Sequence, residues 1–319
     1  MAKTKPVVND QLSYKKPSFW QLVWQHRTLI LMCTPAIIFF FVFSYIPMPG
    51  AYIAFTNFQN NKCIFNSPFI GLQNFKFLFM SGQLTLLLKN TVLYNIAFIL
   101  LGNVLQLLFA ILLNEVACKW FKKTTQSMMF LPYFISDVLV SLLVYNLLNY
   151  DYGFISNMVR NMGGEMAKVY QIPNAWPIII VLVNLWKGTG YGTVVYFAAI
   201  TGMDTSMMEA AQIDGANGFQ RIRYITLPTL KPTVVILFLF AVGGILKGNF
   251  GLFYNLVGNN SMLFKTTDII ETYVYRSMMN SFNFAQSSAV GLFQSVVGFF
   301  IVIGANAFVK KLDPDYALF

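Results

Sequence analysis

The chain has 319 residues, of which 56% are hydrophobic and only 11% are charged, and its formal net charge is +10. A soluble globular domain carries about a quarter of charged residues, so this composition excludes that class and indicates an integral membrane protein. The positive charges are spread over short segments between apolar runs. This distribution argues against a nucleic-acid partner, which would need one concentrated basic surface.

Six apolar runs are each long enough to cross about 30 Å of hydrocarbon as a helix. They predict an all-α polytopic membrane protein whose six spans lie at 28–46, 86–116, 127–149, 176–201, 230–254 and 287–309. No repeat of 20–50 residues and no linker interrupts the runs. We therefore expect one transmembrane domain, 28–309, between an N-terminal segment, 1–27, and a C-terminal tail, 310–319.

The distribution of Lys and Arg predicts the orientation. If the N-terminus is inside, thirteen of the 22 Lys and Arg residues fall on the cytoplasmic side and eight on the outer side, with Lys187 within a span. The positive-inside rule then favours both termini in the cytoplasm. The same topology places the polar segment 202–229, between spans four and five, on the side where ATP is.

Residues 202–229 contain Glu209-Ala210-Ala211, then Gly215, and later Ile225 and Leu227-Pro228. Residues 207–213 are mostly good helix formers, and Gly215 suits a helix end with positive φ. The pattern predicts a helix of about two to three turns. Ala210 and Ala211 would keep one side of it slim enough for another protein to approach.

The role of the polar residues in this short helix is open. Ser206 and Glu209 have the spacing of a capping box, so Glu209 suits either a cap of its own helix or a contact to a partner. Asp214 likewise suits a helix terminus or a second polar contact to a partner.

The spacing of Glu209, Ala210, Ala211, Gly215, Ile225, Leu227 and Pro228 resembles the EAA loop of bacterial ABC importer permeases. In that family the loop is the cytoplasmic element that binds an ATPase subunit. A second string, Gly71-Leu72-Gln73-Asn74-Phe75, is similar to an element of sugar-type permeases. Together with Leu131–Ser136 and the spacing of the spans, it favours the carbohydrate-uptake branch, in particular its oligosaccharide and polysaccharide permeases.

The resemblance implies a type I ABC importer permease fold in the bacterial cell membrane. It implies four kinds of partner: a second related permease subunit, an ABC ATPase dimer, an extracellular solute-binding protein and a carbohydrate substrate. The transport mechanism it implies is alternating access. The residues that would couple the permease to the ATPase are Glu209, Ala210, Ala211, Asp214 and Gly215.

Polar and aromatic residues within the spans are candidates for the translocation path. A carboxylate there costs several kcal/mol unless it faces partners or water, so Asp137 either lines the path or pairs with a neighbour such as Lys187. Trp186 and Tyr191 either stack on a sugar ring or pack in the core. The three glycines of 188–192 permit either close helix approach or a local break that exposes backbone.

Three further features fall near span ends. Pro132 removes a helix hydrogen bond and predicts a kink or a late helix start in span three. Lys247, near the outer end of span five, suits snorkelling to the headgroups. The outer loops, 150–175 and the segment containing Asp268 and Glu271, would face a solute-delivering protein.

The sequence offers no catalytic centre, and we expect no metal or cofactor. His26 is the single histidine, Cys33, Cys63 and Cys118 lack metal-site or disulfide spacing, and no Gly-rich phosphate loop occurs. The chain is therefore expected to be a non-enzymatic permease subunit whose partner hydrolyses ATP. Alternatives are an ABC permease for a non-sugar solute, an ion-coupled secondary transporter, for which more spans and inverted repeats are expected, and a polytopic membrane enzyme.

Overall fold

The computed structural model describes residues 19–59 and 64–312, and the regular elements within these ranges are all helical. Backbone contacts divide the chain into two units, 1–51 and 52–319. In the described part, five helical stretches are long and apolar enough to cross a membrane, and one sharply bent pair of helices makes a sixth. The predicted all-α polytopic architecture is confirmed.

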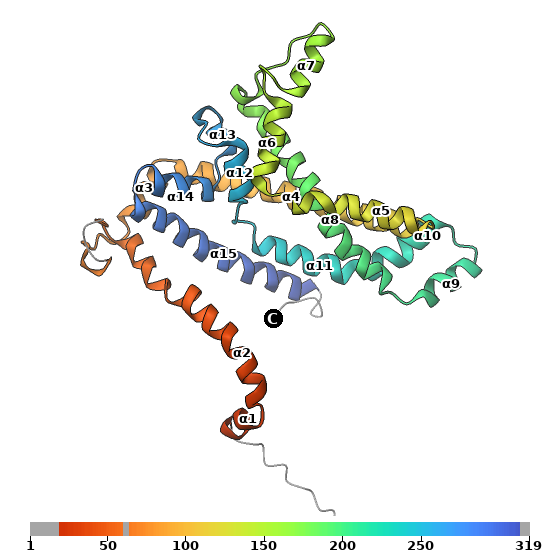
Figure 1. The fold of residues 1–319 in the computed structure, drawn as a ribbon. Coiled ribbons are helices and arrows are strands. Elements are labelled where there is room, and N and C mark those ends of the chain that lie inside the picture. The colour runs from red at the N-terminus through yellow and green to blue at the C-terminus, as the bar shows by residue number, and fades with distance from the viewer. Residues whose placement is uncertain (1–18, 60–63, 313–319) are drawn as a thin grey trace, which may run out of the picture. The chain divides into compact units, whose positions relative to one another are not determined.

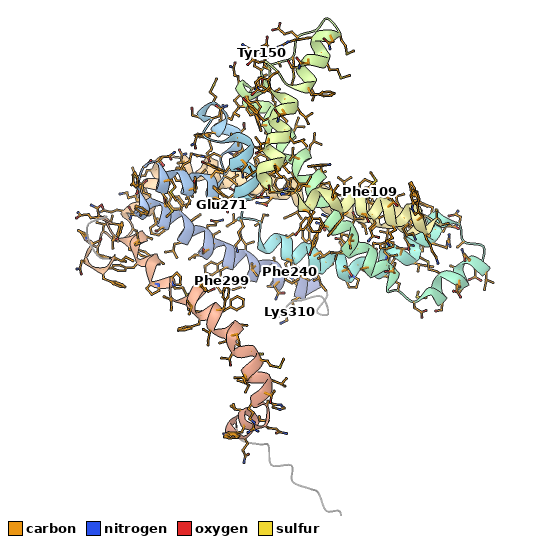
Figure 2. The ribbon with its side chains drawn as sticks, in the orientation of Figure 1. Phe109, Tyr150, Phe240, Glu271, Phe299 and Lys310 are labelled. Carbon is orange, nitrogen blue, oxygen red and sulfur yellow. The ribbon has the colours of Figure 1, made fainter. Side chains whose placement is uncertain are left out.

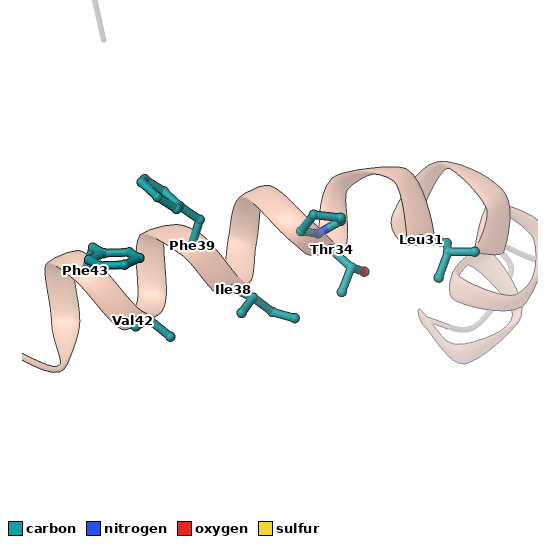
Figure 3. Close-up of a pocket in the computed structure, with 7 residues that line it drawn as sticks. Leu31, Thr34, Ile38, Phe39, Val42 and Phe43 are labelled. Carbon is teal, nitrogen blue, oxygen red and sulfur yellow. The ribbon is translucent and has the colours of Figure 1, made fainter.

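The N-terminal unit contains α1 (Phe19–Gln25) and α2 (Arg27–Phe40), and α2 continues as a π-helical turn, Phe41–Tyr45. Apolar side chains of α2 and of this π-helical turn, among them Ile38 and Val42, line a shallow groove along the helix (Figure 3). The apolar stretch Arg27–Phe55 buries none of its most hydrophobic window. The length and apolar character of this stretch confirm the predicted first span.

The second unit is built around one long helix, α4, and is shown in Figure 1. Its α-helices are α3 (Gln73–Met80), α4 (Gln83–Glu115), α5 (Lys119–Phe130), α6 (Asp137–Leu148), α7 (Phe154–Asn161), α8 (Trp176–Thr201), α9 (Thr205–Ile213), α10 (Gly218–Arg221), α11 (Leu227–Gly243), α12 (Phe250–Val257), α13 (Phe264–Thr267), α14 (Ile270–Met279) and α15 (Phe284–Leu312).

Helix α4 contributes to three buried apolar clusters in succession. Tyr94 packs with α6, α8 and α12, Leu87 packs with α3, α14 and α15, and Ala110 packs with α8 and α11. Because one helix joins all three clusters, α4 links the packing of the other long helices within this second unit.

The predicted third span, 127–149, is sharply bent, because the chain turns by 97° between α5 and α6. A 3₁₀ turn containing Pro132 follows α5, and the Ser136 hydroxyl then accepts the Leu139 N–H (3.4 Å) at the start of α6. Proline supplies no N–H to a helix ladder, and Ser136 offers a new N-cap. The predicted kink or late start at Pro132 is confirmed.

The predicted fifth span, 230–254, is also interrupted. Helix α11 ends at Gly243, residues 244–249 are non-helical, and α12 begins at Phe250. The amide of Asn95 on α4 donates to the carbonyls of Ile245 (3.0 Å) and Lys247 (3.2 Å). Irregular backbone within a membrane protein needs such partners, since lipid offers none.

Two of the three glycines of α8, Gly190 and Gly192, serve close packing, and the alternative of a local break is wrong because α8 is continuous. A Cβ added at Gly190 would collide with the carbonyl oxygen of Met129, at the end of α5. A Cβ at Gly192 would collide with the amide of Gln106 on α4. Small residues are enriched where membrane helices approach closely.

The string Gly71–Phe75 has a structural explanation. The buried Asn74 side chain donates to the carbonyls of Ala54 (2.9 Å) and Thr56 (3.1 Å), which precede it by about twenty residues. Gly71 has φ +62°, a conformation that favours glycine. Asn74 therefore fastens the start of α3 to the preceding segment.

Candidate functional site

The segment 202–229, here termed the EAA loop, begins with the N-cap of α9. The Asp204 carboxylate accepts the Ser206 N–H (2.9 Å), and this hydrogen bond holds the pKa of the carboxyl below its usual value. The predicted capping box of Ser206 and Glu209 is wrong, since Asp204 starts the helix one residue ahead of Thr205. Both Asp and Ser are good caps, and composition alone does not decide between them.

The C-terminus of α9 closes as a Schellman motif. The Gly215 N–H donates to Gln212 (3.1 Å), and the Ala216 N–H donates to the carbonyl of Ala211 (2.9 Å). Gly215 has φ +79°, the left-handed conformation that this motif requires. The predicted helix of two to three turns, ended by Gly215, is confirmed.

After this turn, Asn217 and Gln220 cap α10 reciprocally, with hydrogen bonds of 2.8 and 2.9 Å. Sequence analysis did not identify these two residues, although an Asn followed by Gln three residues later is a capping-box signal. Helix α10 continues through a π-helical turn, Ile222–Thr226, into α11, where Pro228 occupies the first turn. Pro228 cannot donate a backbone hydrogen bond, and a π-turn is one way that a helix accommodates such a residue.

The arrangement fixes α9 at both ends and leaves its flanks open. Glu209, Ala210, Asp214 and Gly215 are exposed, and Ala211 is half-buried. Helix α9 projects beyond the ends of α5 and α8 in Figure 1. A short, capped helix with two alanines and an acidic side chain on open flanks is suited to insertion into a groove of another protein.

A depression of about 350 Å³ separates the end of α9 from α10 and the π-turn, and Asp214, Gly215 and Gln220 are among its lining residues. Arg221 lies in its wall and pairs at 3.9 Å with Glu115, the last residue of α4. The EAA loop is thus connected to the helix that organises the whole unit.

Of the candidate path residues, Asp137 and Lys187 are brought together. They form an ion pair between the first turn of α6 and the middle of α8, with side chains 24% and 18% exposed. A Cβ at Gly251 of α12 would collide with the Asp137 carboxylate, so the pair is held where three helices meet. The ion-pair alternative for Asp137 is confirmed.

Tyr191 joins an aromatic stack at the bend between α5 and α6. Its ring lies 4.9 Å from that of Tyr133 at an interplanar angle of 17°, and both side chains are about half exposed. Trp186 is also exposed, at 45%. Tyr191 thus lies on α8, the helix that also carries the ion-paired Lys187. A solute contact for Tyr191 or Trp186 stays a prediction.

The sequence of this chain matches a family of transport proteins and is similar to a bacterial permease. Residues 102–316 match the family described as binding-protein-dependent transport system inner membrane component. The polygalacturonan/rhamnogalacturonan transport system permease protein YteP of Bacillus subtilis is 36% identical over 91% of this chain and 90% of its own length.

Two solved structures have the same fold. A chain of a bacterial ABC transporter involved in import of the acidic polysaccharide alginate superimposes with a TM-score of 0.83 and 33% identity, covering 92% of this chain and 99% of that chain. A chain of a bacterial alginate ABC transporter in complex with an alginate pentasaccharide-bound periplasmic protein gives a TM-score of 0.82 and 32% identity over 92% of this chain and 98% of that chain. This chain has the type I ABC importer permease fold and belongs to the family of binding-protein-dependent transport system inner membrane components.

Proposed function

We propose that this chain is a permease subunit of an ATP-driven importer that carries an oligosaccharide across the bacterial cell membrane. The observation that carries the proposal is α9 of the EAA loop, a short helix capped at both ends and open along its flanks. The chain itself supplies the path and the coupling element, and a partner ATPase supplies hydrolysis.

The saccharide assignment is supported by the similar proteins, whose names specify polygalacturonan, rhamnogalacturonan and alginate. The complex with a periplasmic protein supports delivery of the solute by a separate binding protein. A second related permease completes the membrane part of the importer. The positive-inside bias supports termini in the cytoplasm, which places the EAA loop on the ATP side.

Within the importer, Glu209, Ala210, Ala211, Asp214 and Gly215 form the surface that the ATPase grips. ATP favours the closed ATPase dimer, and closure moves α9. Since a ligand shifts a conformational equilibrium only through unequal affinity for the two states, ATP must bind the closed state more tightly. The capped ends of α9 transmit the movement, because a frayed helix would absorb it.

Asp137, Trp186, Lys187 and Tyr191 are proposed to lie along the solute path. The ion pair gives the helices around it a fixed spacing, and the exposed rings of Tyr191 and Trp186 offer flat apolar faces of the kind that sugar rings stack on. This assignment is separable from the coupling role, since the EAA loop lies in another part of the unit.

The test is purification of the tagged chain from gently solubilised membranes, with co-purifying proteins identified by mass spectrometry. We expect a second permease and an ABC ATPase to be recovered with the wild type. The variant Gly215→Asp is expected to lose the ATPase and transport while retaining insertion and the second permease, because it adds a charged side chain beside Asp214.

A matched control is Gly163→Asp. Gly163 ends α7 in the same motif, with φ +81° and a 2.9 Å hydrogen bond from Gly164 to Val159, and a Cβ at either Gly163 or Gly215 has no neighbour within 4 Å. The two variants therefore carry the same backbone strain. Retention of the ATPase by Gly163→Asp alone supports the coupling role, whereas recovery of the wild-type chain without any ATPase contradicts the proposal.

A further inference from the structure

The last residue of α4 is a glutamate, Glu115, whose side chain is 42% exposed. Figure 2 labels Phe109, about two turns before Glu115 on the same helix. The C-terminal end of a helix carries partial negative charge, so a cation stabilises it and an anion does not. A cation is close by, since the Lys122 ammonium of α5 donates to the carbonyl oxygen of Asn114 (3.3 Å). Helix stability alone therefore does not explain a carboxylate at Glu115.

The group that Glu115 contacts is the guanidinium of Arg221, on α10 of the EAA loop. Arg221 Nη2 lies 3.9 Å from Glu115 Oε2, and the arginine side chain is 22% exposed. This distance is within the range of an ion pair but too long for a hydrogen bond. Arg221 Nε is buried and has no hydrogen-bond partner among the described residues. The donors of the guanidinium are therefore only partly used.

The unsatisfied Nε of Arg221 and the Nη2 that approaches Glu115 belong to the same edge of the guanidinium. A carboxylate binds such an edge through two parallel hydrogen bonds of about 2.7–2.9 Å. A shift of α10 by about 1 Å toward the end of α4 would bring Nη2 into this range. Because Nε is shielded from solvent in the present state, a rearrangement of the protein has to satisfy it. This geometry indicates an ion pair whose strength depends on the conformational state.

The two partners belong to elements that the proposed coupling has to connect. Arg221 follows the reciprocal caps Asn217 and Gln220, which fix α10 to the turn that ends α9. Glu115 belongs to α4, which contributes to three buried apolar clusters of the second unit. Ile222, next to Arg221, packs against the cluster that α4, α8 and α11 form. A displacement of the EAA loop that moves Arg221 therefore acts on the helix around which the unit is built.

We propose that Glu115 and Arg221 are positioning residues whose ion pair closes when the EAA loop moves toward α4, and that this closure transmits the movement to the transmembrane helices. The inference rests on the coupling role proposed for α9 and adds the step that follows it within this chain. Arg221 lies between Gly215 and Ile225 and is not one of the residues whose spacing resembles the family motif. Neither partner belongs to the surface assigned to the ATPase, so their removal breaks transmission and leaves the ATPase bound.

The experiment uses the complete importer, with its partner permease, ATPase and binding protein, in proteoliposomes. The probes are labelled trigalacturonate and trimannuronate. Saccharide uptake and ATP hydrolysis are measured on the same vesicles, and their ratio gives the saccharides imported per ATP. Co-purification of the ATPase is measured separately. A residue that only stabilises the fold lowers both rates with the amount of folded importer and leaves the ratio unchanged.

Glu115→Gln and Arg221→Gln are each expected to lower this ratio about fivefold or more, the lower end of the range for coupling between sites, while the ATPase is retained. The exchanged pair, Glu115→Arg with Arg221→Glu, restores opposite charges and is expected to raise the ratio again. Its arginine also suits the C-terminal end of α4. Arg221→Lys keeps the charge but lacks the two-donor edge, and its ratio is expected to lie between those of Arg221→Gln and the wild type.

Arg223→Gln is the matched control. Arg223 is exposed, two residues after Arg221, and its guanidinium lies over the Tyr224 ring at 5.9 Å. The substitution removes one positive charge from the same segment without changing the ion pair. Its ratio is expected to equal that of the wild type.

An unchanged ratio in Glu115→Gln, or an equal loss in Arg223→Gln, overturns the inference and leaves ATP-driven import standing. An exchanged pair whose ratio stays as low as that of the single variants does the same. If Arg221→Gln does not assemble, Glu115→Gln decides, because its side chain is the more exposed of the two. Absence of uptake of both saccharides by the wild type overturns the proposed function, and the inference falls with it.

Discussion

The ion pair of Asp137 and Lys187 permits a quantitative test of whether it is structural or part of the solute path. Its side chains are 24% and 18% exposed, so most of each group is removed from solvent. Removing one partner of a buried pair costs about 3–5 kcal/mol, and the remaining exposure here places the expected loss for Asp137→Asn at the lower end, about 3 kcal/mol.

Lys187→Met is expected to cost less, about 2 kcal/mol, because the carboxylate that it leaves unpaired lies in the first turn of α6. There the helix N-terminus stabilises a negative charge by roughly 0.3–1 kcal/mol. Asp137→Asn leaves the Lys187 ammonium in the middle of α8 without such compensation. The double variant removes both charges and is expected to lie within about 1 kcal/mol of the wild type.

The assay is reversible unfolding in mixed detergent micelles, followed by uptake measurements on the same variants. A coupling energy of about 4–6 kcal/mol is expected from the cycle, because the double variant shows almost none of the two single losses. The control cycle combines Asp137→Asn with Lys89→Met, which should be additive within about 0.5 kcal/mol. Additive losses for Asp137 and Lys187 would refute the reasoning, and a stable double variant that no longer transports would support a role in the path.

Gly190→Ala is expected to destabilise the protein by about 1–3 kcal/mol, because the added Cβ meets the Met129 carbonyl. Gly188→Ala is expected to be tolerated, since a Cβ there has nothing within 4 Å. The same unfolding assay compares the two variants, and equal losses would contradict the packing argument. Asn74→Ala removes two hydrogen bonds to buried carbonyls and should lower the free energy of unfolding by about 1–3 kcal/mol in the same assay. An unchanged stability would show that these two hydrogen bonds are dispensable. For Asp204, the depressed pKa means that its contribution to α9 is present above the ordinary value of 3.8 and is lost as pH falls through the lower folded value. Amide-exchange protection of α9 should therefore decrease in acid for the wild type and be independent of pH in this range for Asp204→Asn.

The apolar runs predict the spans well because hydrophobic length is a local property. The two interrupted spans could not be placed in this way. The first break lies in a mostly apolar segment, and the second, 244–249, has its two glycines, Lys247 and Asn249 near an expected span end, where polar residues are ordinary. At the first, Pro132 signals a disturbance, but the 97° angle depends on how α6 packs against α12. At the second, the Gly248 N–H is satisfied by Glu271, more than twenty residues away in the sequence.

The EAA loop was likewise predictable only in part. Gly215 is predictable because positive φ at a helix end is a demand of the backbone itself. The choice of Asp204 over Ser206 as N-cap was missed because it depends on where the first turn closes. A cavity beside Lys247 is lined by residues from three separate segments. Local sequence patterns do not predict which distant segments come into contact.

The bend between α5 and α6 has a mechanical consequence. A continuous helix transmits an axial displacement along its whole length. Helices α5 and α6 meet at 97° and share no hydrogen-bond ladder across the bend. An axial displacement of one helix would therefore rotate the other. Helix α5 packs against α8, and α6 packs against α12. An axial displacement of α5 would therefore reach α12 as a rotation of α6 rather than as an axial shift.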